Sequence, residues 1–152
     1  MPPTITRERP DTGDGVSLIA ELEAHLDPLY PAKSRHGYSV EKLIDQGVAF
    51  FVLRENSTAA GCGGIQLFDK EYGELKRMYV RPQFQGRGFG KLLVDHLVEY
   101  ARSHGIVLLR LETGIHQIPA IRLYERMGFQ RIPPFGSYVD DPLSLFYEKR
   151  IA

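Results

Sequence analysis

A cluster of glycines between a strand-like segment and the most regular helical pattern places the strongest limit on how this chain can fold. Gly86, Gly88 and Gly90 stand within five residues, after apolar residues that end at Val80 and before an amphipathic stretch over 89–105. Glycine leaves backbone N–H groups uncovered and tolerates tight turns. The first N–H groups of a helix also lack internal partners and carry partial positive charge. This strand, turn and helix predict an α/β fold with an anion site suited to a pyrophosphate.

Two common phosphate-binding motifs do not match this turn. A Walker A loop needs Ser or Thr after Gly-Lys, whereas Gly90-Lys91 is followed by Leu92, and Gln85 stands where the loop's first glycine would be. A dinucleotide-binding fingerprint would need glycine in place of Lys91. A plain tight turn and a different kind of diphosphate site are the two interpretations left.

The remaining hydrophobic patterns indicate one domain, residues 1–152, in which strands and helices alternate. Proline and glycine mark most of the expected ends, and Val40, Leu43 and Ile44 are expected to face inward from a short second helix. Strands are expected near 4–8, 48–54, 60–69, 73–80, 106–112, 129–132 and 143–149, and helices near 15–27, 40–46, 89–105 and 119–127. The strand–helix–strand unit in the middle predicts a partly parallel sheet, and 106–112 reads as a continuously buried central strand.

Charge and composition exclude several classes of protein. Nineteen basic and nineteen acidic residues give a formal net charge of +0, so an anionic ligand has to be held locally, and we expect neither nucleic acid nor membrane as a partner. The single cysteine, Cys62, permits no internal disulfide and is interpreted as a small core residue. We expect a cytoplasmic location, because no leader-like or membrane-spanning apolar run is present. The histidines show no metal-ligand spacing, and no metal is expected.

Two segments in the expected order resemble motifs of the GNAT superfamily of acetyl-CoA-dependent N-acetyltransferases. Residues 85–90, Gln-Gly-Arg-Gly-Phe-Gly, resemble its pyrophosphate-binding signature, and residues 117–129 resemble its second motif, a short helix with Ala120, Tyr124 and a closing Gly128-Phe129. The resemblance covers about 48–150. It implies a mixed, mostly antiparallel sheet with a central parallel strand pair splayed around the coenzyme, flanked by about four helices.

The resemblance also implies acetyl-CoA as co-substrate and assigns residues to it. The strand end is expected to offer main-chain groups to the pantetheine arm, and the turn is expected to hold the pyrophosphate. The implied coenzyme-binding residues are Met78, Tyr79, Val80, Gln85, Gly86, Arg87, Gly88, Phe89, Gly90, Lys91 and Gln117. Gln117 departs from the family pattern, which has Asn there, so its contact with the coenzyme is either kept with an adjusted helix start or lost.

Acetyl transfer to an amine needs a proton donor for the leaving thiolate and an acceptor for the ammonium proton. By resemblance Tyr124 is the donor; the alternative is a tyrosine that only packs between helix and sheet. Glu112 and Glu74 are both candidate bases, with Glu112 slightly favoured. Either glutamate could instead have a structural role, Glu74 as a partner of Lys76 or Arg77, and Glu112 as a partner of Arg110 or a helix-end cap. A water chain could then remove the proton.

The binding site for the acceptor amine, called the acceptor side below, is expected in the first two helices, their connection and the last hairpin. Its candidate contacts are Tyr30, Arg35, His36 and Tyr138. These side chains suit a small molecule with an amine and a carboxylate; the alternative is a solvated loop with packing aromatics. The expected reaction is direct attack in a ternary complex, by a small-molecule or peptide amine. A non-catalytic acyl-CoA sensor and a protein N-terminal or lysine acetyltransferase are the alternatives. We expect a monomer or a homodimer.

Overall fold

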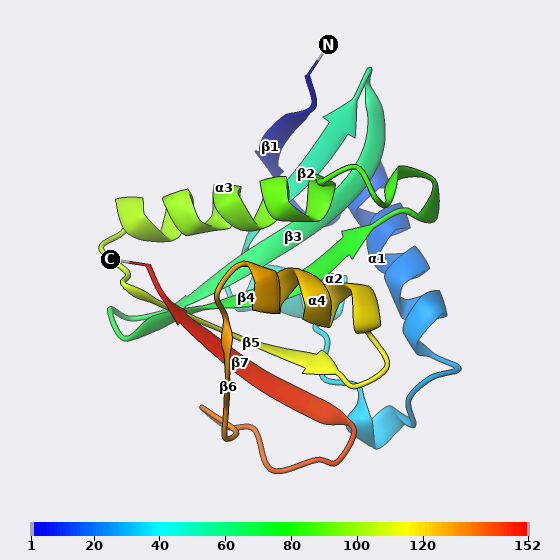
Figure 1. The fold of residues 1–152 in the computed structure, drawn as a ribbon. Coiled ribbons are helices and arrows are strands. Elements are labelled where there is room, and N and C mark those ends of the chain that lie inside the picture. Colours follow the sequence, from blue (N-terminus) through cyan, green and yellow to red (C-terminus); the bar gives the residue numbers. More distant parts are fainter. Residues whose placement is uncertain (1, 152) are drawn as a thin grey trace.

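The structure, a computed structural model, describes residues 2–151 and contains one seven-stranded sheet with helices on both faces (Figure 1). The strands are β1 (Thr4–Glu8), β2 (Ala49–Glu55), β3 (Thr58–Phe68), β4 (Tyr72–Val80), β5 (Leu108–Gly114), β6 (Gln130–Ile132) and β7 (Ser144–Arg150). The helices are α1 (Gly13–Leu26), α2 (Val40–Asp45), α3 (Phe89–Ser103) and α4 (Ile118–Arg126), with short 3₁₀ turns at Ala32–Ser34 and Pro82–Phe84.

Strand pairing confirms the mixed, mostly antiparallel sheet. The strand order is β1-β2-β3-β4-β5-β7-β6, and β4 and β5 are the parallel neighbours. Their pairing covers Gly73↔Leu109 and Glu74↔Arg110, near the start of both strands. Beyond these pairs β4 and β5 diverge, so the carboxyl ends of the two strands border an opening in the middle of the sheet.

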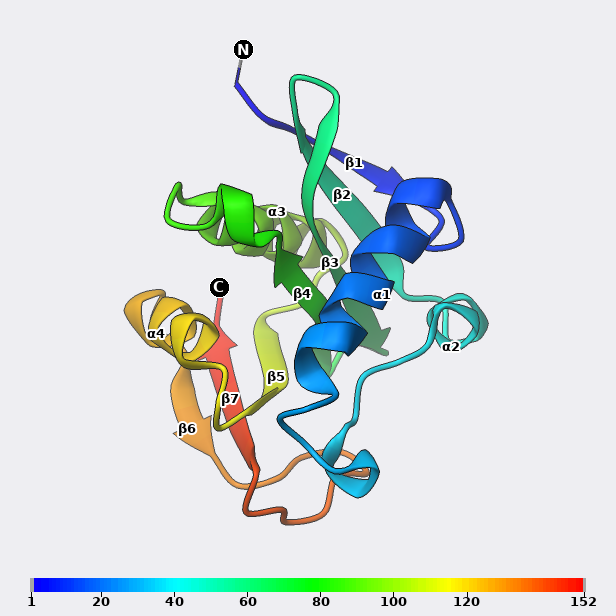
Figure 2. The same cartoon turned by 90° about the vertical axis from the view of Figure 1, so that its right-hand side faces the viewer.

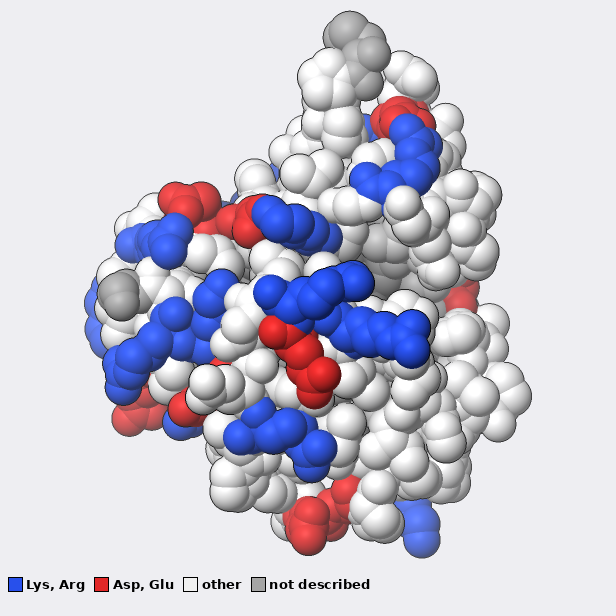
Figure 3. All heavy atoms as spheres, viewed as in Figure 1, with Lys and Arg blue, Asp and Glu red and all other residues white. Residues whose placement is uncertain are grey.

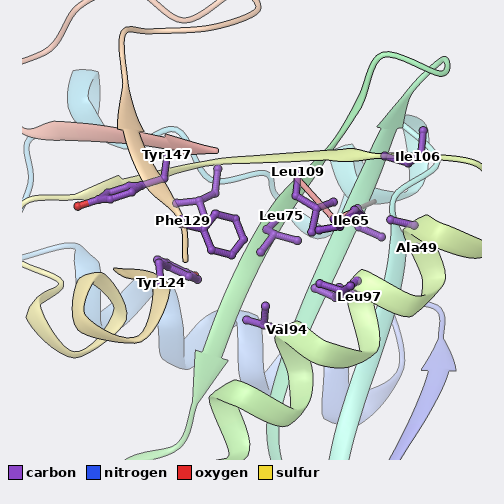
Figure 4. Close-up of a cluster of buried hydrophobic side chains, with 14 of the residues drawn as sticks. Ala49, Ile65, Leu75, Val94, Leu97, Ile106, Leu109, Tyr124, Phe129 and Tyr147 are labelled. Atoms are coloured by element: carbon purple, nitrogen blue, oxygen red, sulfur yellow. The ribbon is translucent and has the colours of Figure 1, made fainter. Parts of the chain in front are cut away.

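The helices form one layer on each side of the sheet. Figure 2 shows α3 and α4 on one side and α1 and α2 on the other. The larger core lies under α3 and α4, where Leu97, Leu109 and Tyr124 pack together (Figure 4). A second core lies under α1 and α2 around Leu18 and Phe50. Two separate cores mean that both faces of the central strands are covered.

The central strand β5 differs from the prediction of a continuously buried strand. Its exposure alternates: Leu109 and Leu111 belong to the core under α3 and α4, while Arg110 and Glu112 alternate with them and are only partly buried. Arg110 lies over the ring of Tyr72. Successive side chains of a strand point to opposite faces. Because Leu111 faces α3 and α4, Glu112 lies on the face of the sheet that α1 covers.

The prediction that Ile44 faces inward is wrong. Ile44 in α2 is 36% exposed, whereas Leu43 beside it is fully buried. In α3, Leu92 is likewise 40% exposed beside the buried Leu93. An apolar residue next to the buried stripe of a helix is therefore not itself part of the core in either place.

Cys62 is a small core residue, as predicted, and a tight turn joins β2 to β3. Asn56 and Ser57 form the tight turn between β2 and β3, both with positive φ. Cys62 is fully buried, and burial raises the pKa of its thiol to about 12, so it is an inert core residue. Among residues 2–151 no helix is long and apolar enough to cross a membrane.

Candidate active site

The glycine turn leaves the start of α3 open to a ligand. Gly86 and Gly88 take left-handed conformations, with φ of 77° and 80°, and a Cβ placed on either would meet no atom within 4 Å. Gly88 is the N-cap of α3, and no side chain caps the helix. Backbone N–H groups therefore face open space at the positive end of a fifteen-residue helix. This cradle fits the diphosphate of coenzyme A.

The charged side chains of the turn are already paired with carboxylates. Arg81 binds Glu21 at 2.8 Å, Lys91 binds Asp95 at 2.8 Å, and Arg87 binds Glu55. The positive charge of these three residues is thus largely matched, and the backbone N–H groups are what the turn offers an anion.

Positive charge also gathers beside the turn, on the face of the molecule that carries α3 and α4. Figure 3 shows Lys and Arg side chains over α4 and the adjoining strands, interspersed with fewer acidic ones. Arg122 and Arg126 of α4 are both exposed. A protein of zero net charge therefore presents a locally positive surface next to the candidate diphosphate cradle.

The last residues of β4 border the opening of the sheet. The side chains of Met78 and Val80 pack into the cores, which leaves main-chain groups as their means of contacting a ligand. The Tyr79 hydroxyl donates to Glu21, away from the opening. The Gln85 side-chain amide donates to the carbonyl of Val80 at 3.0 Å, so this carbonyl already has one partner. Main-chain binding of pantetheine by Met78 and Val80 stays a prediction.

A cavity of about 120 Å³ lies at the opening, and all of the predicted catalytic and acceptor-side residues line it. Its lining includes Met78 and Gln117 from the predicted coenzyme set, together with Tyr30, Arg35, His36, Glu74, Glu112, Tyr124 and Tyr138. The glycine turn itself lies outside it. The structure also adds Lys76 and Arg77, which the sequence indicated only as ion-pair partners.

Tyr124 is a fully packed residue of α4 whose ring faces Phe129 in the core (Figure 4). It is 5% exposed and lines the cavity. Burial, and to a lesser degree the charge of Glu112, raises the pKa of Tyr124, so the phenol keeps its proton at neutral pH. Within residues 2–151 the hydroxyl makes no hydrogen bond. Tyr124 therefore packs in the core, as the structural interpretation expects, and also keeps a hydroxyl that is free to donate a proton.

Glu112 is the carboxylate whose environment suits a base. Burial raises its pKa above the ordinary 4.5, and the Ser144 hydroxyl donates to its Oε2 at 2.8 Å, which opposes that rise. Ser144 is the one hydrogen-bond donor to this carboxylate among the described residues. The predicted alternative partner, Arg110, instead binds Glu148 at 3.1 Å.

Glu74 is held in a buried ion pair. Its Oε2 lies 2.8 Å from Lys76 Nζ and accepts a hydrogen bond from the Tyr138 hydroxyl at 2.6 Å. Glu74 and Lys76 are 3% and 6% exposed, and the Lys76 ammonium lies 4.0 Å from the ring centre of Tyr38. The geometry favours the ion-pair interpretation of Glu74 over a free base.

Tyr30 lines the cavity, and its hydroxyl is hydrogen-bonded to the protein. Its hydroxyl accepts from the backbone N–H of His116 at 2.9 Å and donates to Gln117 Oε1 at 3.2 Å. A Cβ on Gly114 would lie 2.1 Å from this hydroxyl, so the close approach requires glycine. Tyr30 thereby anchors the segment between β5 and α4, and it leaves the amide nitrogen of Gln117 available to the cavity.

Arg35 and His36 reach the cavity from the connection between α1 and α2. Arg35 Nη1 binds Asp27 at 2.7 Å, and His36 Nε2 lies 3.5 Å from Asp141. The His36 ring packs edge-on against Tyr138, which lies in the connection between β6 and β7. The two connections predicted to form the acceptor side are thus in contact. Among residues 2–151 no cluster of His, Cys, Asp or Glu could hold a metal ion.

A split parallel strand pair, a glycine cradle and a cavity with a phenol and a carboxylate together define a class of acyl-CoA-dependent transferases. The Acetyltransferase (GNAT) family matches residues 18–129, and the chain belongs to this family of acetyltransferase enzymes. It is 44% identical to an IAA acetyltransferase of Azospirillum brasilense over 148 residues, 96% of each chain. It is 35% identical to the uncharacterised N-acetyltransferase YsnE of Bacillus subtilis over 138 residues, 90% of this chain and 91% of that one.

Solved structures have the same fold. A Klebsiella pneumoniae protein named as an acyl-CoA N-acyltransferase superposes with a TM-score of 0.84 at 38% identity, over 99% of this chain and 98% of that chain. The PaiA N-acetyltransferase of Thermoplasma acidophilum, solved with coenzyme A, superposes with a TM-score of 0.79 at 20% identity, over 99% of each chain. The second similarity shows the fold alone, in a protein that holds coenzyme A.

Proposed function

We propose that this enzyme transfers the acetyl group of acetyl-CoA to a primary amine by direct attack in a ternary complex. The observation that carries the proposal is that Glu112 and Tyr124 line one cavity at the opening between β4 and β5. They reach it from opposite faces of the sheet, Glu112 from the side of α1 and Tyr124 from the side of α4. A base and an acid are therefore available at the same opening for an amine and a thioester.

In the proposed reaction Glu112 accepts the proton of the acceptor's ammonium group. The free amine attacks the thioester carbonyl, so an N–C bond forms, the C–S bond breaks, and the products are the acetylated amine and the free thiol. Tyr124 donates a proton to the departing sulfur, and its raised pKa ensures that the phenol carries this proton at neutral pH. The nitrogen loses its second proton as the amide forms, and this proton restores the phenol of Tyr124. Glu112 has a raised pKa for the same reason of burial, which makes it a stronger proton acceptor than an exposed carboxylate.

Acetyl-CoA supplies the activated acetyl group. The open N–H groups of the turn at Gly86 and Gly88 would hold its diphosphate, the end of β4 would lie along the pantetheine arm, and the Gln117 amide would donate from its place beside Tyr30. The exposed arginines of α4 place further positive charge near this path.

The test is release of thiol from acetyl-CoA against a panel of primary amines and short peptides, with the binding of acetyl-CoA measured in parallel by calorimetry. The proposal expects saturable binding and acceptor-dependent thiol release. Binding with no turnover on any acceptor would support a non-catalytic sensor instead, and turnover on peptides alone would support a protein acetyltransferase.

A further inference from the structure

The strand β4 contains a β-bulge, which places the side chains of Lys76 and Arg77 on the same face of the sheet, the face that α1 and α2 cover. Between Cys62↔Tyr79 and Gly64↔Lys76 the register with β3 shifts, so that Gly63 opposes both Arg77 and Met78. Arg77 has a φ of 54°, the left-handed region that side chains other than glycine rarely adopt. Such a bulge changes the direction of a side chain.

The consequence of the bulge is visible in the contacts of the neighbouring residues. Leu75 and Met78 pack in the core under α3 and α4. Lys76 faces Tyr38 on the opposite side, and Arg77 joins it there: a Cβ on Gly37 would lie 1.8 Å from Arg77 Nη1, and Arg77 Nη2 binds Glu23 of α1. In a regular strand Arg77 would point to the side of Leu75, into the apolar core.

Two N–H donors at this end of the cavity have no partner. Arg77 Nε and Arg35 Nε are buried and make no hydrogen bond within residues 2–151, while His36 Nε2 has only the Asp141 carboxylate, 3.5 Å away. All three residues line the cavity, and Arg35 and Arg77 share Glu23 as an ion-pair partner, which brings the two guanidinium groups close together. A buried donor without a partner is unfavourable, so a ligand that provides an acceptor here is favoured.

The positive charge of the buried Arg77 guanidinium is only partly compensated by nearby carboxylates, which favours binding of an anion. The side chain of Arg77 is 3% exposed, whereas its partner Glu23 is 43% exposed and the Asp27 carboxylate beside Arg35 is 68% exposed. Solvent screens these exposed carboxylates, so they compensate the buried guanidinium only partly. Lys76 does not compete for the anion, because Glu74 already pairs with it at 2.8 Å.

We propose that Arg77, with Arg35 and His36, binds a carboxylate of the acceptor, so that the enzyme acts on small molecules carrying both an amine and a carboxylate. The inference rests on the proposed acetyl transfer. Glu112 and these three residues line the same small cavity, so an acceptor whose amine reaches Glu112 places its carboxylate against the guanidinium groups. Arginine suits this ligand because its planar fork matches the two oxygens of a carboxylate.

The test compares each of several α-, β- and γ-amino acids with its own primary amide as acceptor. The amide keeps the amine in place and removes the carboxylate, and its amine loses a proton more readily, so intrinsic reactivity alone would favour the amide. We expect kcat/KM for the amino acid to exceed that for its amide by roughly ten- to hundredfold for the best acceptor, as for a charge-assisted hydrogen bond.

Variants of Arg35 and Arg77 test whether these two residues cause the preference for the amino acid over its amide. Arg35→Gln and Arg77→Lys should lower the preference for the acid over the amide mainly through the KM of the acid. Arg54→Gln is the matched control, because Arg54 is also ion-paired, with Glu8 and Asp14, but lies outside the cavity. If Arg77→Lys does not fold, the carboxylate site is still tested by comparing each amino acid with its amide in the wild type and in Arg35→Gln.

The outcomes separate this inference from the proposed function. Equal turnover of acid and amide would overturn the carboxylate site and leave acetyl transfer intact. An acid preference unchanged in both cavity variants would overturn the assignment to Arg35 and Arg77. Turnover of no amine by an enzyme that binds acetyl-CoA would overturn both proposals.

Discussion

At the scale of single residues, the environment distinguishes two glutamates that the sequence leaves nearly equivalent. Glu74 and Glu112 both follow apolar strand residues and both line the cavity. Lys76 and Tyr138 bind Glu74, whereas Glu112 receives a single hydrogen bond from Ser144 and has its pKa raised by burial. The choice between them depends on partners from β7 and from the β6–β7 connection, which are 32 and 64 residues away in the chain.

Glu112→Gln tests the base. We expect kcat/KM to fall by roughly 100-fold or more, as for loss of a general base. In the wild type, kcat/KM should decline on the acidic side through a pKa above 4.5, because the base must be ionised. In the variant that decline should disappear, leaving only the titration of the acceptor amine. A wild-type profile retained in the variant would contradict the role.

The same substitution makes a prediction about stability. A carboxyl whose pKa is higher in the folded than in the unfolded protein favours folding while it is protonated, and this contribution is lost as the pH rises from 4.5 through the folded pKa. At neutral pH Glu112→Gln should therefore raise the free energy of unfolding in urea, and the gain should shrink towards pH 4. A variant less stable than the wild type at pH 7 would show that burial does not dominate this site.

Tyr124→Phe tests the acid. The hydroxyl makes no hydrogen bond within the described residues, so its removal should leave folding stability nearly unchanged. We expect kcat to fall by roughly 100-fold while calorimetry shows acetyl-CoA affinity within a few-fold of wild type. Loss of affinity with unchanged kcat would mean that Tyr124 only shapes the binding site.

At the scale of elements, the strand–turn–helix unit was predictable because its signal is local. Glycines, apolar periodicity and the helix start are read within about twenty residues, and β4, the turn and α3 lie within a few residues of their predicted bounds. Other element features were not predictable. The exposure of Ile44 and Leu92 and the alternating burial of β5 depend on which neighbours cover each face, and the bulge at Arg77 depends on the pairing of β4 with β3.

Gly88→Val tests the turn. A branched side chain would fill the open space in front of the helix N-terminus and would disfavour the φ of 80°, so binding of acetyl-CoA should be lost in calorimetry. Gly47→Val is the control, because Gly47 also has positive φ and open space but follows α2, away from the turn. Gly47→Val should cost stability without loss of binding. Unchanged affinity in Gly88→Val would exclude the turn as the diphosphate site.

At the scale of the whole molecule, contacts distant in sequence hold the two sides of the sheet in one arrangement. Tyr30, after α1, bonds the segment between β5 and α4 across 86 and 87 residues. The N-terminal half of the chain thus helps to position Gln117 and the start of the helix that carries Tyr124.

Tyr30→Phe tests this link. The substitution removes both hydrogen bonds of the hydroxyl, so we expect a loss of about 1 kcal/mol in the free energy of unfolding and a higher KM for acetyl-CoA. In a Gln117→Ala background the effect of Tyr30→Phe on this KM should largely disappear, because the two residues act through one contact. Fully additive effects would contradict the link.

The sequence alone determined the class of fold, the glycine turn before α3 and the candidate acid, because these depend on short segments with a local physical signature. The tertiary structure alone decided which glutamate is free of an ion pair, that the Tyr30 hydroxyl bonds the segment before α4, and that Arg77 lines the cavity. The Glu74–Lys76 pair is local, and the sequence offered it as an alternative. Burial, the hydrogen bonds from Ser144 and Tyr138, and the direction of a side chain at a bulge are set by neighbours far away in the chain, and no local pattern records them.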